Sequence, residues 1–439
     1  MTRGIVLAAP SSGCGKTVIT LALLRALRRA GMRPGSLKIG PDYIDPGFHR
    51  AASGGECRTY DSWAMRRETL NDQIAPVAAQ CDVVVAEGVT GLFDGAADGT
   101  GSTADAASRL GWPIVLIADV RGQGASVAAL VEGFARHRDD TKIAAVIFNR
   151  VGSSRHRDIL SAAMAPTGIP ILGMIPRDPA LALPDRHLGL IQAEEQPGLN
   201  QKIDRAAAVI EAEINLNAVL DYAAPIAPIA PVVDHGGSVP VSPPGQRIAV
   251  ARDDAFSFIY PHVLDGWRRA GAAISYFSPL ADDAPAAGSD AVYLPGGYPE
   301  LHAGRLSKNE VFLNGLRQAA SEKATIYGEC GGFMVLGEAL TDRDGQRFDM
   351  AGLLPIRTSF AEPRLQLGYR KLALHGDNFL GKKGAEYRGH EFHYSSQIGP
   401  EPANPLFTAT DAVDKAVPPA GCRRGTVMGA YIHLIDRVE

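Results

Sequence analysis

Short apolar runs alternate with helix-like stretches along the first half of the chain. Residues 4–9 form an uninterrupted apolar run, which is typical of a strand buried on both faces. Residues 17–29 then repeat apolar side chains at helical spacing. Because such strand–helix units recur, the pattern predicts a parallel sheet with helices on both faces. The further predicted strands are residues 34–39, 81–87, 113–120, 143–149 and 170–176, and the further predicted helices are residues 101–110, 126–134 and 199–222.

The pattern breaks at residues 223–245, where Pro, Ala and Gly dominate. This composition favours an extended linker and indicates a domain boundary. Strand–helix alternation then resumes, so we expect an α/β protein with domains at residues 1–222 and 246–439. The predicted elements of the second domain are strands at residues 247–251, 273–277 and 291–294, a helix at 257–270, and a strand from 324 that leads into a helix ending near 338.

The overall composition narrows the class of protein. A chain of 439 residues can form two or three domains, each with its own core. A net charge of −4 gives no reason to expect nucleic acid or an anionic membrane as partner. No apolar run reaches membrane-spanning length, and the first strand begins too early to leave room for a signal peptide. Five scattered cysteines favour a reducing cytoplasm, and no Cys or His spacing is typical of a zinc site.

The turn between the first strand and the first helix carries a phosphate-binding pattern. Residues 10–17 (the phosphate loop) differ from G-x-x-x-x-G-K-[ST] only at Pro10. A glycine-rich turn at a helix N-terminus directs backbone N–H groups at an anion. We therefore expect Lys16 to reach the β- and γ-phosphates of a nucleotide and Thr17 to bind Mg²⁺. The alternative is an accidental Lys-Thr pair, which the flanking strand and helix disfavour. The other nucleotide-binding candidates are Ser12, Gly13 and Gly15.

Further polar residues follow strand ends, where open α/β sheets bind ligands. Asp42 and Asp45 lie in a predicted loop framed by Pro and Gly, either as Mg²⁺ ligands or as ordinary turn residues. Glu87 ends a buried strand, where a second metal-binding carboxylate is expected in a phosphate-loop protein. Asn149 also ends a strand, and it could contact a nucleotide base or simply cap a turn.

The second half contains a candidate nucleophile. Cys330 lies among glycines where a predicted strand turns sharply into a helix, and such a turn needs small neighbours to expose a nucleophile. We expect the helix N-terminus to lower the pKa of the thiol, although a buried structural cysteine is the alternative. His433, which follows a strand-like run, is the preferred base, and residues 387–394 are predicted to form a loop that contacts substrate. The remaining candidate bases are His262, His302, His375, His390 and His393.

These motifs together carry a resemblance to known families. The first half resembles the dethiobiotin-synthetase-like P-loop proteins, and the second half resembles class I glutamine amidotransferases. In the second half, residues 295–300 match the oxyanion loop. The order of the halves, with segments 38–46, 87–95 and 186–190, is similar to the cobyrinate and hydrogenobyrinate a,c-diamide synthases. The resemblance covers nearly the whole chain except the linker.

The resemblance implies a cytoplasmic ligase of cobalamin biosynthesis that amidates the a and c carboxylates of hydrogenobyrinate or cobyrinate. It would use ATP, L-glutamine and Mg²⁺, form acyl phosphates, and pass ammonia along an enclosed path between its two sites. Neither nucleic acid nor a membrane would be a partner. A homodimer is also compatible with the resemblance. The implied catalytic pair is Cys330 and His433. The remaining implied residues are Gly297 and Gly331 for the oxyanion, Thr17, Asp42 and Glu87 for the metal, and Asp45, Asp94, Arg186 and His187 for the substrate.

The chain departs from the amidotransferase pattern at one position. Most members of the class have an acid two residues after the histidine, and here that residue is Ile435. The departure implies a Cys–His dyad. It leaves open whether Asp436 or a backbone carbonyl orients His433.

Three other functions are considered: a cobyric acid synthase, a nickel-sirohydrochlorin amidase, and a non-catalytic P-loop regulator with a degenerate amidotransferase domain. Segments 40–46 and 119–126 look closer to the a,c-diamide enzymes. The presence of Lys16, Glu87 and Cys330 argues against a regulator. The motifs do not decide between a metal-free and a cobalt-containing corrinoid, and we take the metal-free hydrogenobyrinate as the working choice.

Overall fold

The computed structural model describes residues 2–181, 185–186, 189–190, 192–227, 239–399 and 403–438. The chain forms two compact units. Unit 1 contains Met1–Trp63 and Arg67–Val232, and unit 2 contains Ala64–Arg66 and Val233–Glu439. The boundary between the two units therefore lies within the predicted linker. Residues 228–238 of that linker are outside the described residues.

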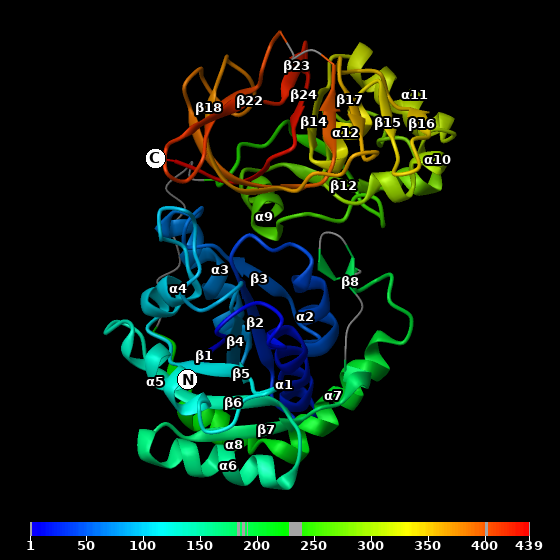
Figure 1. Cartoon of the computed structure of the whole chain (residues 1–439). Coiled ribbons are helices and arrows are strands. Elements are labelled where there is room, and N and C mark those ends of the chain that lie inside the picture. The colour runs from blue at the N-terminus through cyan, green and yellow to red at the C-terminus, as the bar shows by residue number, and fades with distance from the viewer. Residues whose placement is uncertain are drawn as a thin grey trace. The chain divides into compact units, whose positions relative to one another are not determined.

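Unit 1 is built on a parallel sheet with strand order β3-β2-β4-β1-β5-β6-β7. Helices α1, α2 and α7 lie on one side of this sheet, and α3, α4, α5 and α6 lie on the other (Figure 1). The arrangement confirms the predicted α/β fold of the first half. The strands are β1 (Arg3–Ala8), β2 (Pro34–Ile39), β3 (Cys57–Tyr60), β4 (Val83–Glu87), β5 (Ile114–Asp119), β6 (Ile143–Val151) and β7 (Ile171–Pro176). The helices are α1 (Lys16–Arg29), α2 (Asp45–Ser53), α3 (Arg67–Gln80), α4 (Thr103–Leu110), α5 (Val127–Arg136), α6 (Ser154–Met164), α7 (Leu199–Glu213) and α8 (Leu216–Tyr222).

The central strands of unit 1 are apolar because helices cover both of their faces. Strand β4 is buried at all five positions, and β1 is buried at every position after Arg3. Helix α4 begins at a capping box in which Ser102 and Asp105 satisfy each other's backbone N–H groups. The sheet therefore holds the carboxyl ends of β1, β2, β4 and β6 along one edge, where the predicted ligands lie.

Three predictions for unit 1 differ from the structure. Asp45 is the first residue of α2 rather than a loop residue, because Pro46 and the Asp42 side chain, which accepts from the N–H groups of Ile44 and Asp45, start a helix there. The predicted helix 199–222 breaks at Ile214, whose backbone is extended. In the predicted linker, β10 (Ala224–Pro225) pairs with β1 and extends the sheet. Short segments β8 (Asp185–Arg186) and β9 (Gly189–Leu190) form a two-stranded hairpin.

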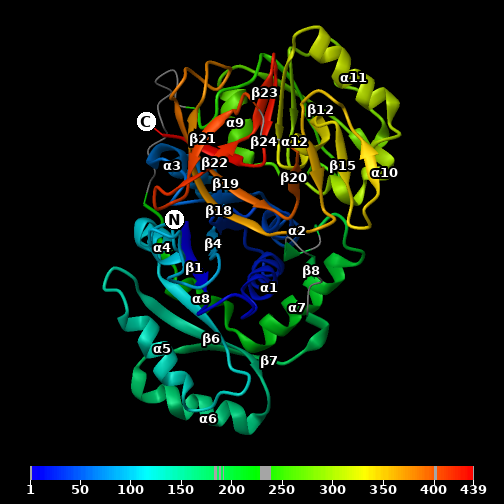
Figure 2. The ribbon, with the colours of Figure 1, turned by 45° about the horizontal axis from the view of Figure 1, so that its top comes forward.

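Unit 2 centres on a six-stranded sheet with the order β12-β11-β13-β14-β24-β23 (Figure 2). It also contains a five-stranded sheet with the order β22-β21-β18-β19-β25. A four-stranded sheet has the order β16-β15-β17-β20. The strands are β11 (Arg247–Ala251), β12 (Ala273–Phe277), β13 (Ala291–Leu294), β14 (Thr325–Glu329), β15 (Ala339–Thr341), β16 (Arg347–Asp349), β17 (Arg357–Ser359), β18 (Gln366–Leu374), β19 (Glu386–His393), β20 (Ser396–Ile398), β21 (Phe407–Thr410), β22 (Ala416–Ala420), β23 (Cys422–Arg424), β24 (Val427–Ala430) and β25 (His433–Arg437). The helices are α9 (Pro261–Arg269), α10 (Ala303–Leu306), α11 (Glu310–Ser321) and α12 (Gly331–Leu336).

Two predictions for unit 2 differ from the structure. The helix expected from residue 257 begins only at Pro261, because a proline at the first helical position cannot continue a preceding helical turn. Residues 387–394 were expected to form a loop, whereas most of them belong to β19, which pairs with both β18 and β25. Among the described residues, no helix has the length and hydropathy that a membrane span requires.

Candidate active sites

The phosphate loop joins β1 to α1 in a conformation that favours glycine at two positions. Gly13 and Gly15 have φ angles of 79° and 95°. A Cβ atom on Gly15 would lie 2.2 Å from Asn149 Nδ2, so no larger residue fits there. Asn149 Nδ2 in turn donates to the carbonyl of Cys14 at 2.8 Å. The end of β6 therefore holds the loop in place, and Ser12 is exposed on it.

Lys16 is folded over the same loop. Its Nζ donates to the carbonyl of Ser11 at 3.4 Å and to the carbonyl of Thr90. Burial and the neighbouring charge of Lys38 lower the pKa of Lys16. A cation held in this way, above backbone N–H groups at a helix N-terminus, is suited to bind an anionic ligand.

A buried acid cluster, consisting of Lys38, Asp45, His49 and Glu87, lies at the ends of β2 and β4. Glu87 Oε1 accepts from Lys38 Nζ at 2.9 Å, and Glu87 Oε2 lies 2.7 Å from His49 Nε2. Lys38 Nζ also contacts Asp45 Oδ2 at 2.5 Å. The lysine is thus shared between two carboxylates. Thr17 Oγ1 adds a hydrogen bond of 2.6 Å to Glu87 Oε1 and connects the cluster to the phosphate loop.

The charges within the buried acid cluster are fixed by these contacts. Burial alone would favour a neutral Glu87, but Lys38, His49 and Thr17 hold the pKa of Glu87 below its usual range. Burial also opposes the charge on Lys38, yet Asp45 and Glu87 raise its pKa. Glu87 is therefore ionised and Lys38 is charged at neutral pH. Burial, and then the neighbouring Asp42, raise the pKa of Asp45 to about 7.

The oxygen atoms beside the phosphate loop suit a hard divalent cation. Thr17 and Glu87 present two such oxygens 2.6 Å apart, at the N-terminus of α1, and Mg²⁺ prefers ligands of this kind shared with nucleotide phosphates. Asp42 instead uses Oδ1 to accept from the N–H groups of Ile44 and Asp45, at 2.8 and 3.0 Å. Thr17 and Glu87 therefore fit a metal site, while Asp42 caps α2 through one of its two oxygens.

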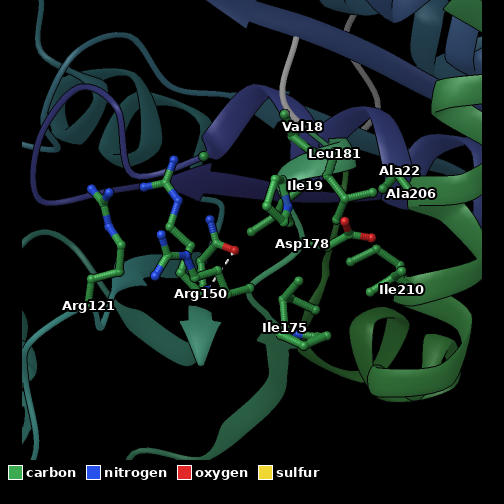
Figure 3. A pocket seen from close by; sticks show the side chains of 16 residues that line it. Val18, Ile19, Ala22, Arg121, Arg150, Ile175, Asp178, Leu181, Ala206 and Ile210 are labelled. Carbon is green, nitrogen blue, oxygen red and sulfur yellow. Dashed lines mark hydrogen bonds between the residues drawn. The ribbon is translucent and has the colours of Figure 1, made fainter. Parts of the chain in front are cut away.

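A pocket of about 210 Å³ opens beside the phosphate loop. Figure 3 shows Arg121 and Arg150 at one end of it and Ala206 and Ile210 at the other. Arg150 donates to the carbonyl of Gly13 at 2.9 Å and also pairs with Asp119. The pocket is thus polar where it meets the loop and apolar toward α7. The remaining lining residues include Gly15, Val18, Asn149, Ile175, Pro176 and Asp178.

The remaining predicted substrate residues of unit 1 are Asp94, Arg186 and His187. Asp94 is exposed, and its Oδ2 accepts from the N–H of Gly91 at 2.9 Å. Arg186 lies in β8, and only its backbone is described. His187 lies outside the described residues.

In unit 2, Cys330 occupies a strained turn between β14 and α12. Its φ and ψ angles are 46° and −104°, a region that residues with a side chain rarely adopt. The backbone N–H of Cys330 donates to the carbonyl of Ala430 at 2.8 Å, which ties the turn to β24. The sharp strand-to-helix turn is therefore the one expected of an exposed nucleophile, although the side chain itself is 1% exposed.

His433 lies next to Cys330 across Gly296. A Cβ atom on Gly296 would lie 3.1 Å from both Cys330 Cβ and His433 Nε2, and 2.4 Å from His433 Cε1. The thiol and the imidazole therefore approach the same point, and only glycine leaves room between them. His433 is the first residue of β25 and is fully buried.

The two predicted oxyanion glycines also meet at this site. A Cβ atom on Gly331 would lie 3.0 Å from the backbone nitrogen of Gly297, and one on Gly297 would lie 2.0 Å from the carbonyl of Ala255. The N–H of Gly331 donates a hydrogen bond to the Cys330 side chain. Backbone donors from two loops thus converge beside the thiol, as stabilisation of a tetrahedral intermediate requires.

The expected lowering of the Cys330 pKa is wrong. Burial, and then the charge of Glu300, raise the pKa of the thiol, and the hydrogen bond from Gly331 only partly offsets them. Burial and the charges of His390 and His393 lower the pKa of His433 to about 3. The resting pair is therefore a neutral thiol beside a neutral imidazole.

Asp436, one of the groups considered for orienting His433, is engaged elsewhere. Arg66, which belongs to unit 2, donates to Asp436 Oδ1 from Nε at 3.0 Å and from Nη2 at 2.9 Å. The backbone N–H of Arg66 donates to Asp436 Oδ2 at 2.8 Å. His262 Nε2 lies 2.8 Å from the carbonyl of Ile435. An acid that sequence reasoning passed over, Glu329, instead lies 3.8 Å from His433 Nδ1.

Sequence reasoning missed three residues of these sites. Lys38 carries a usable signal, because a lysine inside a fully buried strand must find a buried partner. Glu329 carries a weaker one, an acid directly before the nucleophile. His49 carries none, because no helix was predicted over the residues that hold it.

Comparison with known proteins identifies both halves of the chain. Residues 5–191 match the CobQ/CobB/MinD/ParA nucleotide binding domain, and residues 247–437 match the CobB/CobQ-like glutamine amidotransferase domain. The chain is 50% identical to the hydrogenobyrinate a,c-diamide synthase of Rhizobium meliloti (strain 1021), over 100% of both chains. It is also 50% identical to the enzyme of that name from Brucella abortus biovar 1 (strain 9-941), over 99% of this chain and 98% of the relative.

Proposed function

The chain belongs to the family of hydrogenobyrinate a,c-diamide synthases, and we propose that it converts the a and c carboxylates of hydrogenobyrinate into amides with glutamine and ATP. The nucleotide-binding and amidotransferase domains make it a glutamine-dependent amidating ligase. Carboxylate oxygen is a poor leaving group, so ATP must activate the acid before ammonia can attack. The two candidate sites divide these two tasks.

Unit 1 supplies the activation. The corrinoid carboxylate attacks the γ-phosphorus of ATP, ADP departs, and an acyl phosphate forms; ammonia then attacks the carbonyl carbon and inorganic phosphate leaves. Lys16 places positive charge where the phosphoryl group transfers, and Lys38 holds Glu87 and Asp45 in position beside it. Thr17 and Glu87 would hold Mg²⁺, which would neutralise charge on the phosphates.

The pocket beside the phosphate loop supports a place for the nucleotide. Its volume of about 210 Å³ is below that of a pocket for a drug-sized molecule, so it accommodates a nucleobase and excludes a corrinoid. Asn149 lines it while holding the loop through Cys14. We propose that the base lies between Ile175 and α7, with Asp178 as the polar group nearest its edge.

Unit 2 supplies ammonia. Because thiol and imidazole are both neutral at rest, the Cys330 proton passes to His433 Nε2 as the sulfur attacks the glutamine amide carbon. The N–H groups of Gly297 and Gly331 hold the oxyanion, and His433 returns the proton to the departing nitrogen. Water then hydrolyses the glutamyl thioester to glutamate.

The observation that carries this proposal is the convergence of Cys330 and His433 on Gly296, in a chain that also holds a phosphate loop linked to a buried acid cluster. The test is incubation with ATP, Mg²⁺ and glutamine labelled at its amide nitrogen. We expect the label to enter hydrogenobyrinate twice, seen by mass spectrometry. Label that entered only an a,c-diamide or nickel-sirohydrochlorin would identify one of the alternative amidases, and label in no tetrapyrrole would contradict the proposal.

The proposed location is the cytoplasm, and the cysteines support it. All five are free thiols, a state that a reducing compartment maintains. A homodimer stays a prediction.

A further inference from the structure

Glu329 is a buried acid that the proposed reaction has not used. It directly precedes the nucleophile at the end of β14, and its side chain is 5% exposed. Three donors hold its carboxylate: Tyr293 Oη at 2.8 Å, Tyr327 Oη at 3.1 Å and the backbone N–H of Leu434 at 3.1 Å. A carboxylate fixed this firmly has a defined direction within the core of unit 2.

The carboxylate faces the side of His433 opposite to the thiol. Glu329 Oε2 lies 3.8 Å from His433 Nδ1, while His433 Nε2 lies toward Cys330 at Gly296. Leu434, whose N–H donates to Glu329 Oε1, is the residue after His433. The same carboxylate therefore holds the backbone of the histidine and approaches its ring.

Other polar side chains also lie near His433. His390 lies opposite His433 in the pairing of β19 with β25, and Tyr260 packs its ring 6.3 Å from the imidazole. The charges of His390 and His393 both disfavour a protonated His433. The carboxylate of Asp436 accepts three hydrogen bonds from Arg66. Glu329 Oε2, at 3.8 Å from Nδ1, is within ion-pairing distance of His433 once the imidazole is protonated.

We propose that Glu329 is the positioning residue of His433, replacing the acid that amidotransferases of this class carry two residues after the histidine. The carboxylate keeps the Nδ1–H tautomer, so that Nε2 accepts the Cys330 proton, and it stabilises the imidazolium that forms. The sulfur–carbon bond forms as the thiol proton moves to Nε2. That proton then leaves with ammonia, and Glu329 neither gains nor loses a proton in the cycle.

Glu329 is suited to stabilise the positive charge that His433 carries only during the reaction. Burial raises the pKa of its carboxyl group to about 7, while its three donors act in the opposite direction. The ionised form is therefore available near neutral pH and becomes favoured as His433 takes up a proton. The inference rests on the proposed glutaminase reaction at Cys330, but not on the identity of the corrinoid.

The test compares Glu329→Gln with the wild type in the full chain. The amide keeps an oxygen for the Leu434 N–H and loses the charge. We expect glutamine hydrolysis to lose on the order of 100-fold in kcat with an unchanged KM, and the rate limb near pH 7 to disappear. Alkylation of Cys330 by iodoacetamide should slow in parallel, and ammonia-driven amidation should stay at the wild-type rate.

A second variant distinguishes a role in positioning His433 from a role in folding alone. Glu329→Asp restores a carboxylate and should recover the pH limb at a reduced rate, whereas Glu338→Gln, an exposed acid of the same unit, should behave like the wild type. A Glu329→Gln enzyme with a wild-type hydrolysis rate and pH profile would show that the carboxylate only anchors β25. Glu329→Asp behaving like Glu329→Gln, or loss of ammonia-driven turnover in Glu329→Gln, would also overturn the inference. If no tetrapyrrole is amidated, glutamine hydrolysis and alkylation still decide the role of Glu329.

Discussion

Lys38 Nζ lies 2.9 Å from Glu87 Oε1, and both side chains are almost entirely buried. The same amine contacts Asp45, so one cation neutralises two carboxylates inside unit 1. Burying charges costs several kcal/mol per ion, and pairing them offsets that cost only while every partner is present. The pair therefore joins the stability of the sheet edge to the chemistry beside the phosphate loop.

Replacing Lys38 by Met should reduce both the stability of unit 1 and the amidation activity. The variant leaves Asp45 and Glu87 buried without their shared cation, and we expect a loss on the order of 3–5 kcal/mol in the free energy of unfolding. Amidation should be lost with either glutamine or ammonia, because Glu87, a proposed Mg²⁺ ligand, loses the cation that holds it ionised and in place. Urea unfolding and product analysis measure the two effects. The control, Arg33→Met, breaks an exposed ion pair with Asp82 and should leave stability and amidation unchanged. Equal losses of stability and amidation in the two variants would refute this account.

Lys16→Ala should abolish amidation from either nitrogen source while glutamine hydrolysis at Cys330 continues. Lys16 belongs to the phosphate loop, and no other step of the proposed reaction uses it. Amide formation with ammonium and basal glutamate release are measured separately. Lys382→Ala, which removes an 89% exposed lysine, is the matched control. Undiminished ammonia-driven turnover in Lys16→Ala would refute the phosphate role.

Filling the pocket beside the phosphate loop should weaken nucleotide binding alone. Ala206→Phe places a ring against the space lined by Ile175 and Ile210. We expect the KM for ATP to rise on the order of tenfold, with no change in glutamine hydrolysis. Steady-state kinetics at varied ATP measure this, and an unchanged KM would show that the base lies elsewhere.

Cys330→Ala should lose glutamine hydrolysis completely and keep ammonia-driven amidation, because only the first reaction needs a sulfur nucleophile. Cys422→Ala is the matched control, since Cys422 is an equally buried thiol of the same unit. Glutamate release and amide formation are measured in parallel. A variant of Cys330 that lost both activities would identify a structural role for this residue.

The sequence predicts the parts of the fold in which one physical signal dominates. The apolar runs that became β1, β4 and β5 are buried by helices on both faces, so their hydrophobicity alone identifies them. Cys330 was recognised because its glycine neighbours are needed for close approach. Helix α2 was missed because its start depends on a cap from the Asp42 side chain and not on apolar periodicity.

Residues whose role depends on distant partners could not be predicted in this way. Strand β19 looks polar in sequence because Glu391 pairs with Arg370 of β18 and with His393 of β19 itself. The pKa of Cys330 depends on burial by the whole unit, which a local motif cannot show. Glu329 ends β14 and His433 begins β25, and these strands belong to different sheets. Only the tertiary packing in which the Leu434 N–H donates to Glu329 brings the two side chains within 3.8 Å.

The buried histidines of unit 2 should make its stability depend on pH. Burial, and then the charge of Arg370, lower the pKa of His390 to about 3, against an unfolded value of about 6.5. Between these values the unfolded chain binds one more proton, so the free energy of unfolding rises with pH by about 1.4 kcal/mol per pH unit for each such histidine. This stabilisation is complete above about pH 6.5 and is lost as the pH falls toward 3. His390→Gln should reduce the slope in that window by about that amount and leave the slope above it unchanged. Urea unfolding at several pH values measures the slope, and an unaltered slope in the variant would show that another group takes up the proton.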